Sequence, residues 1–167
     1  IKISEILAIE PASHVIFLGD YIDRGGQELE TLNTLELLKR QFPKNIHFLI
    51  GNHEQMLFDV LYDIYMLRKG CDEQLENQLN FHIRNWQYNG GFTTLYGRTE
   101  GFGDWSEFSP FIRQIQRFLP LFRTFVGKIN ISVNDSGKGY PELYTFTHAG
   151  EFPEHLVDPE TLHPNQP

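Results

Sequence analysis

Six residues whose side chains could bind a metal or a phosphate follow three short segments with strand-like composition. They are Asp20, Asp23 and Arg24 after the segment 15–18, Asn52 and His53 after the segment 46–50, and His148 after the segment 143–147. Carboxylate, amide and imidazole groups without thiolates are ligands suited to Mn, Fe, Zn or similar divalent ions. A guanidinium beside them offers a fork that matches phosphate oxygens. The combination predicts metal-assisted chemistry on a phosphate group.

These side-chain types favour distinct roles. A carboxylate can bridge two ions, and a neutral amide oxygen or an imidazole can complete the shell of one of them. Two ions held close together would clamp a phosphate and generate a nucleophile from water at neutral pH. His53 is then placed to protonate a leaving-group oxygen, and Asp23 to orient that imidazole. The pieces fit hydrolysis of a phosphoester by a metal-activated water.

Taken singly, each motif has a simpler explanation. Acidic residues after a strand commonly form a turn with capping carboxylates, and Gly-Asn-His or His-Ala-Gly is usually just a turn. Together the motifs are more specific, because each one follows a predicted strand and all three occur in order. We therefore favour the functional interpretation of the set.

The elements that must position these residues begin with a strand, a helix and a strand. Strands are predicted at 14–18 and 46–50, and the leucine spacing predicts an amphipathic helix over 28–42 between them. Such a unit implies parallel strands, whose carboxyl ends lie at the same edge of a sheet. The residues that follow the two strands are therefore expected at one edge.

The remaining elements are predicted to be helical up to residue 121 and extended after it. The predicted helices span 1–9, 55–68, 73–88 and 109–118, the last with Pro110 in its first turn. Strand character begins at Leu121 and continues through 129–133, a turn covers 134–139, and a strand returns at 143–147. No helix or strand is predicted after residue 150.

Composition limits the class of protein. A chain of 167 residues is expected to form one domain, and its net charge of −8 argues against a nucleic-acid partner because Lys and Arg are not in excess. No apolar run reaches membrane-spanning length, and a single cysteine, Cys71, allows no intramolecular disulfide. We expect a cytoplasmic protein with no membrane contact.

The segments Gly19-Asp20-Tyr21-Ile22-Asp23-Arg24-Gly25, Gly51-Asn52-His53-Glu54 and His148-Ala149-Gly150 resemble motifs of the calcineurin-like metallophosphoesterase superfamily. More narrowly, they resemble the phosphoprotein phosphatase group of bacterial and phage type. The resemblance implies an α/β fold with central sheets of β-sandwich type, flanked by helices in a four-layer architecture. It also implies one domain over 1–167, with a helical insert at about 55–120.

The resemblance assigns a role to each motif residue. The implied metal ligands are Asp20, Asn52 and His148, the implied catalytic residues are His53 and Asp23, and the implied phosphate contact is Arg24. Two divalent ions of Mn, Fe or Zn type are implied, with Asp20 as the bridge between them. The implied activity is that of a protein serine/threonine phosphatase, in which a metal-bound hydroxide attacks phosphorus directly. The implied partner of the protein is its substrate, a phosphorylated protein or a small phosphoester.

Two motifs of the family are missing from this sequence. The family begins with an Asp-x-His-Gly motif that holds the first metal, and a later Gly-His motif supplies another ligand to the second. Nothing here matches either, and His155 and His163 are interpreted as surface residues because no Gly precedes them. We therefore expect a fragment that lacks both ends, with an incomplete ligand set.

Other functions stay open at this point. One is a symmetrical dinucleoside tetraphosphatase, although Glu54 favours the phosphatase because Asp is expected there in that relative. Another is a catalytically incomplete module that binds phosphate or protein. The aromatic residues of the helical insert either line a lid over the site or form the core of the insert, and we prefer the core. They are Trp86, Tyr88, Phe92 and Tyr96. Gly103-Asp104 echoes the first motif but has no strand before it, so we interpret it as unrelated.

Overall fold

The strands form two sheets in the computed structural model, which describes residues 2–70, 72–96, 105–134 and 141–149. The central sheet has three parallel strands in the order β1, β2, β3. They are β1 (Val15–Phe17), β2 (Ile46–Leu49) and β3 (Phe125–Val126). The second sheet is an antiparallel hairpin of β4 (Lys128–Asn134) and β5 (Pro141–Thr147).

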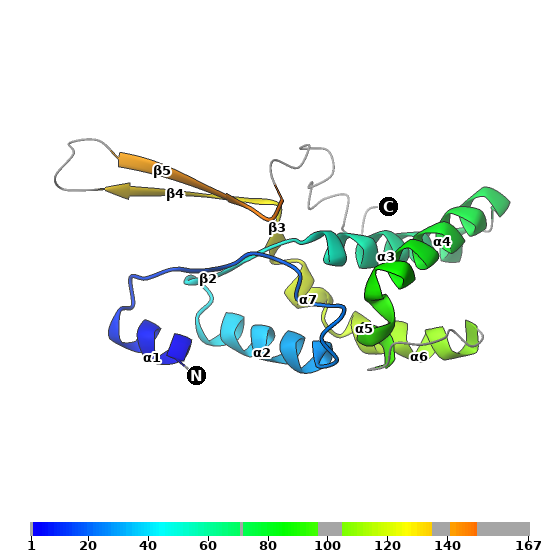
Figure 1. The fold of residues 1–167 in the computed structure, drawn as a ribbon, viewed down its shortest axis with the longest axis horizontal. Helices are drawn as coiled ribbons and strands as arrows, with labels where there is room; N and C mark the ends of the chain where they lie inside the picture. Colours follow the sequence, from blue (N-terminus) through cyan, green and yellow to red (C-terminus); the bar gives the residue numbers. More distant parts are fainter. Residues whose placement is uncertain (1, 71, 97–104, 135–140, 150–167) are drawn as a thin grey trace.

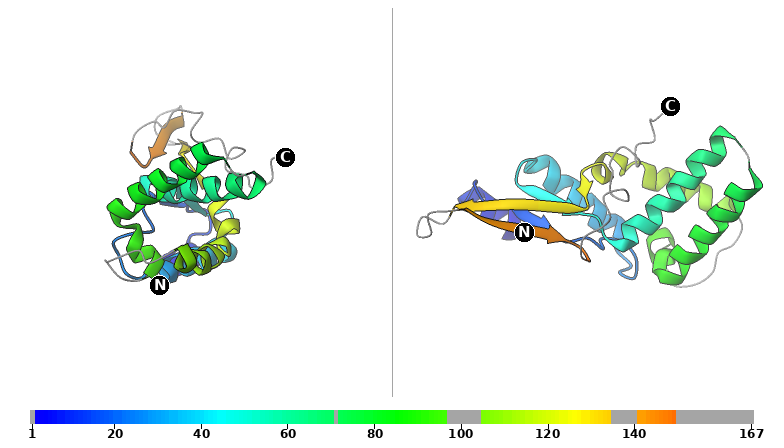
Figure 2. Two further views of the ribbon diagram at one scale, coloured as in Figure 1. Left: turned by 90° about the vertical axis from the view of Figure 1, so that its right-hand side faces the viewer. Right: turned by 90° about the horizontal axis from the view of Figure 1, so that it is seen from above.

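Helices flank the sheets. In Figure 1, α1 (Lys2–Ile9) and α2 (Glu28–Gln41) lie on one side of the central sheet, and the β4–β5 hairpin lies on the other. The view from the side in Figure 2 shows the same order. This is the mixed α/β architecture, with helices flanking sheets, that the sequence predicted.

The predicted βαβ unit is confirmed. β1 and β2 pair in parallel, with Val15 opposite Ile46 and Phe17 opposite Phe48. The helix between them, α2, buries one face of leucines, which are Leu32, Leu35 and Leu38. β1 and β2 therefore end at the same edge, and the segments that follow them start side by side.

All the described elements between β2 and β3 are helical, and we call residues 52–122 the helical segment. Its elements are α3 (Asn52–Lys69), α4 (Glu73–Trp86), the π-helical turn η1 (Gln87–Gly91), α5 (Phe92–Tyr96), α6 (Trp105–Gln116) and α7 (Leu119–Phe122). α3 and α4 pack against each other, as the two views of Figure 2 show. None of the helices in the described ranges has the length and apolar character needed to span a membrane.

Two element boundaries differ from the sequence predictions in ways that affect the site. α3 begins at Asn52 rather than residue 55, so Asn52 and His53 lie in its first turn. The early start is stabilised by the Glu54 side chain, which accepts the N–H of Gly51 at 2.9 Å. The helix predicted over 73–88 ends at Trp86, where η1 begins.

The predictions around residues 105–122 need larger corrections. α6 begins at Trp105 rather than residue 109, so Pro110 lies inside the helix and not in its first turn. Leu121 was predicted to begin a strand but belongs to α7, which has a proline at its start and buries Leu121 and Phe122. A proline in the first turn favours a helix because its fixed φ suits that position. Asn134, predicted to begin a turn, is the last residue of β4. The predictions for 135–139, Gly103-Asp104, His155 and His163 lie outside the described residues.

Candidate active site

The Asp20 loop, residues 19–26, connects β1 to α2 and has an unusual backbone. Asp20, Asp23 and Arg24 have φ angles of 58°, 69° and 65°. Residues other than glycine rarely adopt this left-handed region, and each such residue costs about 1–2 kcal/mol. Strain of this kind persists only where the surroundings hold it, and it is concentrated at functional sites.

Side chains of three helices hold the loop, because every backbone N–H over residues 20–26 is donated to a side-chain oxygen. The carboxylate of Glu54 in α3 accepts the first three, at 2.9, 2.7 and 3.2 Å. The hydroxyls of Thr94 and Thr93 in α5 accept the next two, at 2.8 and 2.5 Å. The carboxylate of Glu28 in α2 accepts the last two, both at 2.9 Å. These bonds offset the strain and fix where the loop's side chains point.

Glu54 joins the loop to the start of α3. It is completely buried. Burial raises the pKa of its carboxyl, while the N–H groups of Asp20, Tyr21 and Gly51 act in the opposite direction. Gly51 lies so close to the loop that an added Cβ would overlap Asp20 and Glu54. The segments that follow β1 and β2 are thus held in close contact next to Asp20.

Asp20, Asn52 and His148 form what we call the acceptor cluster. Nε2 of His148 lies 3.1 Å from Oδ1 of Asn52 and 3.3 Å from Oδ1 of Asp20. The other ring nitrogen, Nδ1, donates to the carbonyl of Leu18 at 2.5 Å. In the neutral imidazole the proton therefore lies on Nδ1 and Nε2 carries a lone pair. Three electron pairs then face one another, and the donor found for them among the described residues is the backbone N–H of His53, 3.4 Å from Oδ1 of Asp20.

The acceptor cluster fits a divalent cation. Ligands at right angles around an ion, with bonds of about 2.1 Å, lie about 3 Å apart, which is close to the separations found here. A histidine that binds a metal also typically donates its other N–H to a carbonyl or carboxylate, as His148 does. The fit is partial, because the described residues contain no group of three or more His, Cys, Asp or Glu able to hold a metal. These residues would supply part of a ligand shell.

Asp23 and His53 form a second, buried feature. Nδ1 of His53 lies 2.7 Å from Oδ2 of Asp23, and the two side chains are 6% and 0% exposed. Oδ2 also accepts the indole N–H of Trp86 at 2.9 Å, and Oδ1 accepts the hydroxyl of Thr94. Burial raises the pKa of Asp23, and the bonds from Thr94, His53 and Trp86 act against that rise.

Arg24 lies at the exposed side of the loop. Its Nε donates to the backbone carbonyl of Asn89 at 2.9 Å, which fixes the plane of the guanidinium. Within the described residues, the structure gives its two terminal amino groups no protein partner. Those groups are free to bind the oxygens of an anion such as phosphate.

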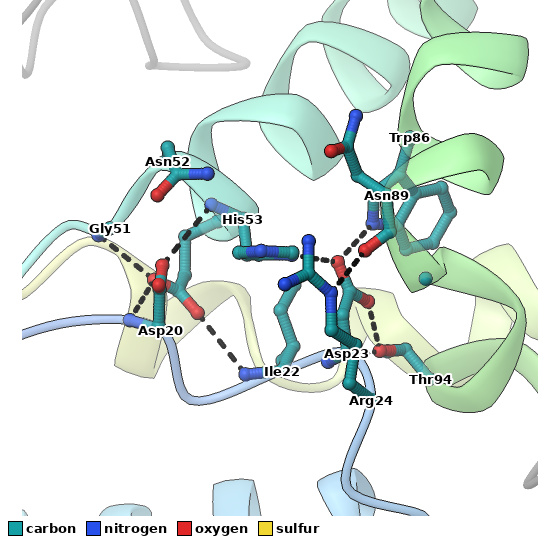
Figure 3. A network of polar contacts seen from close by, with 12 residues as sticks. Asp20, Ile22, Asp23, Arg24, Gly51, Asn52, His53, Trp86, Asn89 and Thr94 are labelled. Atoms are coloured by element: carbon teal, nitrogen blue, oxygen red, sulfur yellow. Dashed lines mark hydrogen bonds and ion pairs between the residues drawn. The ribbon is translucent and has the colours of Figure 1, made fainter.

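The structure brings all six predicted residues into one place. Figure 3 shows Asp20 and Asn52 on one side of the His53 imidazole, and Asp23 and Arg24 on the other. His148 reaches the same place from the second sheet, beyond the end of β5. The site is therefore assembled from both sheets and the helical segment.

Residues that hold the site were not recognised from the sequence. The sequence does not predict a supporting role for Glu54, although its place in the first turn of a helix is typical of a capping residue. Thr94 lies 71 positions from Asp23 and carries no local signal. Trp86 was assigned to a lid or a core, and it is completely buried, whereas Tyr88 is 91% exposed. The side chain of Tyr96 lies outside the described residues.

Comparisons with known proteins agree with the chemistry of this site. A family model described as calcineurin-like phosphoesterase matches residues 2–160. A Saccharomyces cerevisiae protein (strain ATCC 204508 / S288c) described as serine/threonine-protein phosphatase PP2A-like PPG1 is 35% identical over 88 residues, which is 53% of this chain and 22% of the relative. This match spans about a fifth of the relative's length. No solved structure significantly matches the chain.

Proposed function

The chain belongs to the calcineurin-like phosphoesterase family, and on that premise we propose that it hydrolyses phosphoserine or phosphothreonine esters in proteins. One observation carries the proposal. The Asp20 loop presents a partial metal shell at Asp20 and a buried carboxylate–imidazole pair at Asp23, with Arg24 next to the pair. These are the groups needed to bind a phosphate, activate a nucleophile and protonate a leaving group.

Asp20, Asn52 and His148 are the residues that would hold metal. Divalent ions bound there would polarise the phosphoryl oxygens and lower the pKa of a water so that it can attack phosphorus. The choice of Mn, Fe or Zn is open, because oxygen and imidazole ligands suit all three. The family generally uses two ions, and Asp20 is the candidate bridge between them.

The other residues act on the substrate. Arg24 binds phosphoryl oxygens through its two terminal amino groups while Asn89 holds its Nε. His53 transfers the proton on its Nε2 to the leaving oxygen as the bond between that oxygen and phosphorus breaks. Asp23 keeps the proton on Nδ1 throughout, which holds the imidazole in one orientation.

The protein substrate is supported by the similarity to the yeast relative, which is described as a serine/threonine-protein phosphatase. A net charge of −8 weighs against a nucleic-acid substrate, because there is no excess of Lys or Arg to neutralise its backbone. A phosphorylated side chain needs only the local positive charge of Arg24 and the metals.

The test is a substrate panel with the purified full-length protein. We expect Mn²⁺-dependent release of phosphate from a phosphoserine peptide, abolished by a chelator and by Asp20→Asn. Cleavage of diadenosine tetraphosphate with little release from the peptide would instead identify a dinucleotide hydrolase. Absence of hydrolysis of every substrate in the metal-loaded protein would identify a binding module. Full activity in Asp20→Asn would contradict the assignment of the metal bridge.

A further inference from the structure

The helical segment contacts the two substrate-facing residues of the Asp20 loop separately. Trp86 and Thr94 bond to the Asp23 carboxylate. Thr93 and Asn89 bond to Arg24 instead. All four come from α4, η1 and α5, which lie well away from the strand ends in sequence. The helical segment thus supports Asp23 and Arg24 through two separate sets of contacts.

Thr94 bonds twice to Asp23. Its Oγ1 accepts the backbone N–H of Asp23 at 2.8 Å and donates its own proton to Oδ1 of the same residue. Because the N–H can only donate, the hydroxyl proton is left to point at the carboxylate. Thr94 is 2% exposed, so water does not easily replace these bonds. Its hydroxyl fixes both the backbone and the carboxylate of Asp23.

Trp86 holds the other oxygen of Asp23. Its indole N–H donates to Oδ2, the oxygen that faces Nδ1 of His53. The ring is completely buried and packs against Phe111, with ring centroids 5.7 Å apart. The indole therefore has little freedom to turn. With both oxygens held, the plane of the carboxylate is set before a substrate arrives (Figure 3).

We propose that Trp86 and Thr94 are positioning residues for proton transfer, which hold Asp23 so that it keeps the His53 imidazole aimed at the leaving group. This inference rests on the proposed function of His53 as the proton donor. Neither residue touches the substrate. They act through Asp23, and their loss lets the carboxylate and the imidazole turn away from the productive orientation.

The adjacent residue Thr93 provides a matched control on the same helix. Its hydroxyl accepts the N–H of Arg24 and donates to the carbonyl of Gly90 at 2.9 Å. Gly90 has a φ of +107°, and a Cβ there would lie 2.7 Å from Cγ of Arg24. Thr93 thus supports the residue that binds phosphate, and Thr94 supports the pair that moves the proton.

The two threonines are distinguished by the leaving group. An alkyl phosphate needs a proton on its leaving oxygen, whereas p-nitrophenolate leaves without one. We expect Thr94→Val to lower kcat on an alkyl phosphate about 10- to 100-fold, a part of the ~10²–10⁴ that a general acid supplies. The loss on p-nitrophenyl phosphate should be much smaller, with KM little changed. Thr93→Val should raise KM equally for both substrates, and Thr94→Ser should restore kcat because it keeps the hydroxyl.

A double variant tests whether Thr94 acts through His53. In a His53→Asn background, Thr94→Val should cause no further loss on the alkyl phosphate, since the proton donor is already gone. Trp86→Phe keeps an aromatic ring but removes the N–H. In the His53→Asn background it too should cause no further loss on the alkyl phosphate. Losses that multiply in the double variant, or that are equal for both leaving groups, would overturn the proposal and leave a purely structural role.

A measurement without turnover separates this proposal from the proposed function. In ¹⁵N-histidine NMR of the full-length protein, the Nδ1–H of His53 should give a protected signal, assigned by its absence in His53→Asn. Thr94→Val should weaken or remove this signal and Thr94→Ser should keep it. His82, whose Nδ1 lies 2.6 Å from Oδ2 of Asp63, is the internal reference and should not change. An unchanged His53 signal in Thr94→Val would contradict the positioning role even in a protein without phosphatase activity.

Discussion

The acceptor cluster and the Asp23–His53 pair each contain an aspartate of the Asp20 loop and a residue from the first turn of α3, but they differ in how their polar atoms are satisfied. In the cluster, lone pairs of Asp20, Asn52 and His148 converge, and the donor found there among the described residues is the backbone N–H of His53, 3.4 Å from Oδ1 of Asp20. The Asp20 and His148 side chains are 38% and 16% exposed. In the pair, both oxygens of Asp23 are occupied by protein donors and its side chain is fully buried. The polar atoms of the first region remain available to a ligand, whereas those of the second are satisfied by protein donors.

This difference separates two ways of making a reactive site. Converging lone pairs repel one another, and a cation bound between them would remove that repulsion, so we expect the acceptor cluster to be stabilised by metal. A buried carboxylate with three donors is already organised, so the pair depends on packing by the helical segment. Substitutions in the two regions should therefore impair different properties, metal affinity in the acceptor cluster and turnover in the Asp23–His53 pair.

The largest effect is expected when the acceptor cluster loses a ligand. His148→Ala removes one electron pair, and affinity for Mn²⁺ should fall by more than the ~10- to 100-fold that loss of a supporting residue costs. Phosphatase activity should fall with it. Metal binding measured by calorimetry gives the affinity, and excess Mn²⁺ should restore part of the activity. Retention of full metal affinity would remove His148 from the ligand set.

His53→Asn should lower turnover without removing the metal. A general acid contributes about 10²- to 10⁴-fold to rate, so kcat should fall within that range on an alkyl phosphate. Metal content, measured by elemental analysis, should stay close to that of the wild type because the imidazole points toward Asp23. Loss of metal in this variant would mean that His53 belongs with the acceptor cluster, and the contrast between the two regions would break down.

Glu54→Gln should affect both regions together. The Glu54 carboxylate accepts N–H groups from Asp20, Tyr21, Ile22 and Gly51, and the amide would direct N–H groups at some of these donors. Each bond to a charged group contributes about 1.5–3 kcal/mol, so we expect a loss of at least ~2 kcal/mol in the free energy of unfolding. Denaturant titration measures it. Loss of metal affinity with unchanged stability would show that Glu54 serves only the acceptor cluster.

The sequence predicted which residues meet at the candidate site, but it did not predict most of the residues that hold them in place. Asp20, Asn52 and His148 follow predicted strands, and the rule that parallel strands end at one edge placed the first two together. Thr94 could not be found this way, because its contact with Asp23 spans 71 positions and depends on how α5 packs. α7 was missed because the apolar residues of Leu121–Phe122 suit a strand and a buried helix equally.

The smallest effect is expected at Asp59, a carboxylate of α3 outside both regions. Its Oδ1 accepts from Gln55 at 2.9 Å, and burial raises its pKa above the ordinary value of 3.8. Asp23 also has a pKa raised by burial, so this property alone does not identify a site residue. What differs is the set of donors: three hold Asp23 beside an imidazole, whereas Gln55 is the hydrogen-bond donor found for Asp59 among the described residues.

The sign of the Asp59 effect follows from its raised pKa. The folded protein disfavours the ionised form, so ionisation costs stability above the folded pKa, and this cost disappears below the unfolded value of 3.8. Asp59→Asn should therefore stabilise the protein at pH 7, by no more than about 1 kcal/mol, and the gain should vanish as the pH falls below that value. Denaturant unfolding at pH 7 and at a pH below 3.8 measures this difference in the free energy of unfolding, and kcat is the control. A large fall in kcat would mean that a buried carboxylate of α3 contributes to turnover as well as the Asp23–His53 pair, and the contrast in donors would not explain the site.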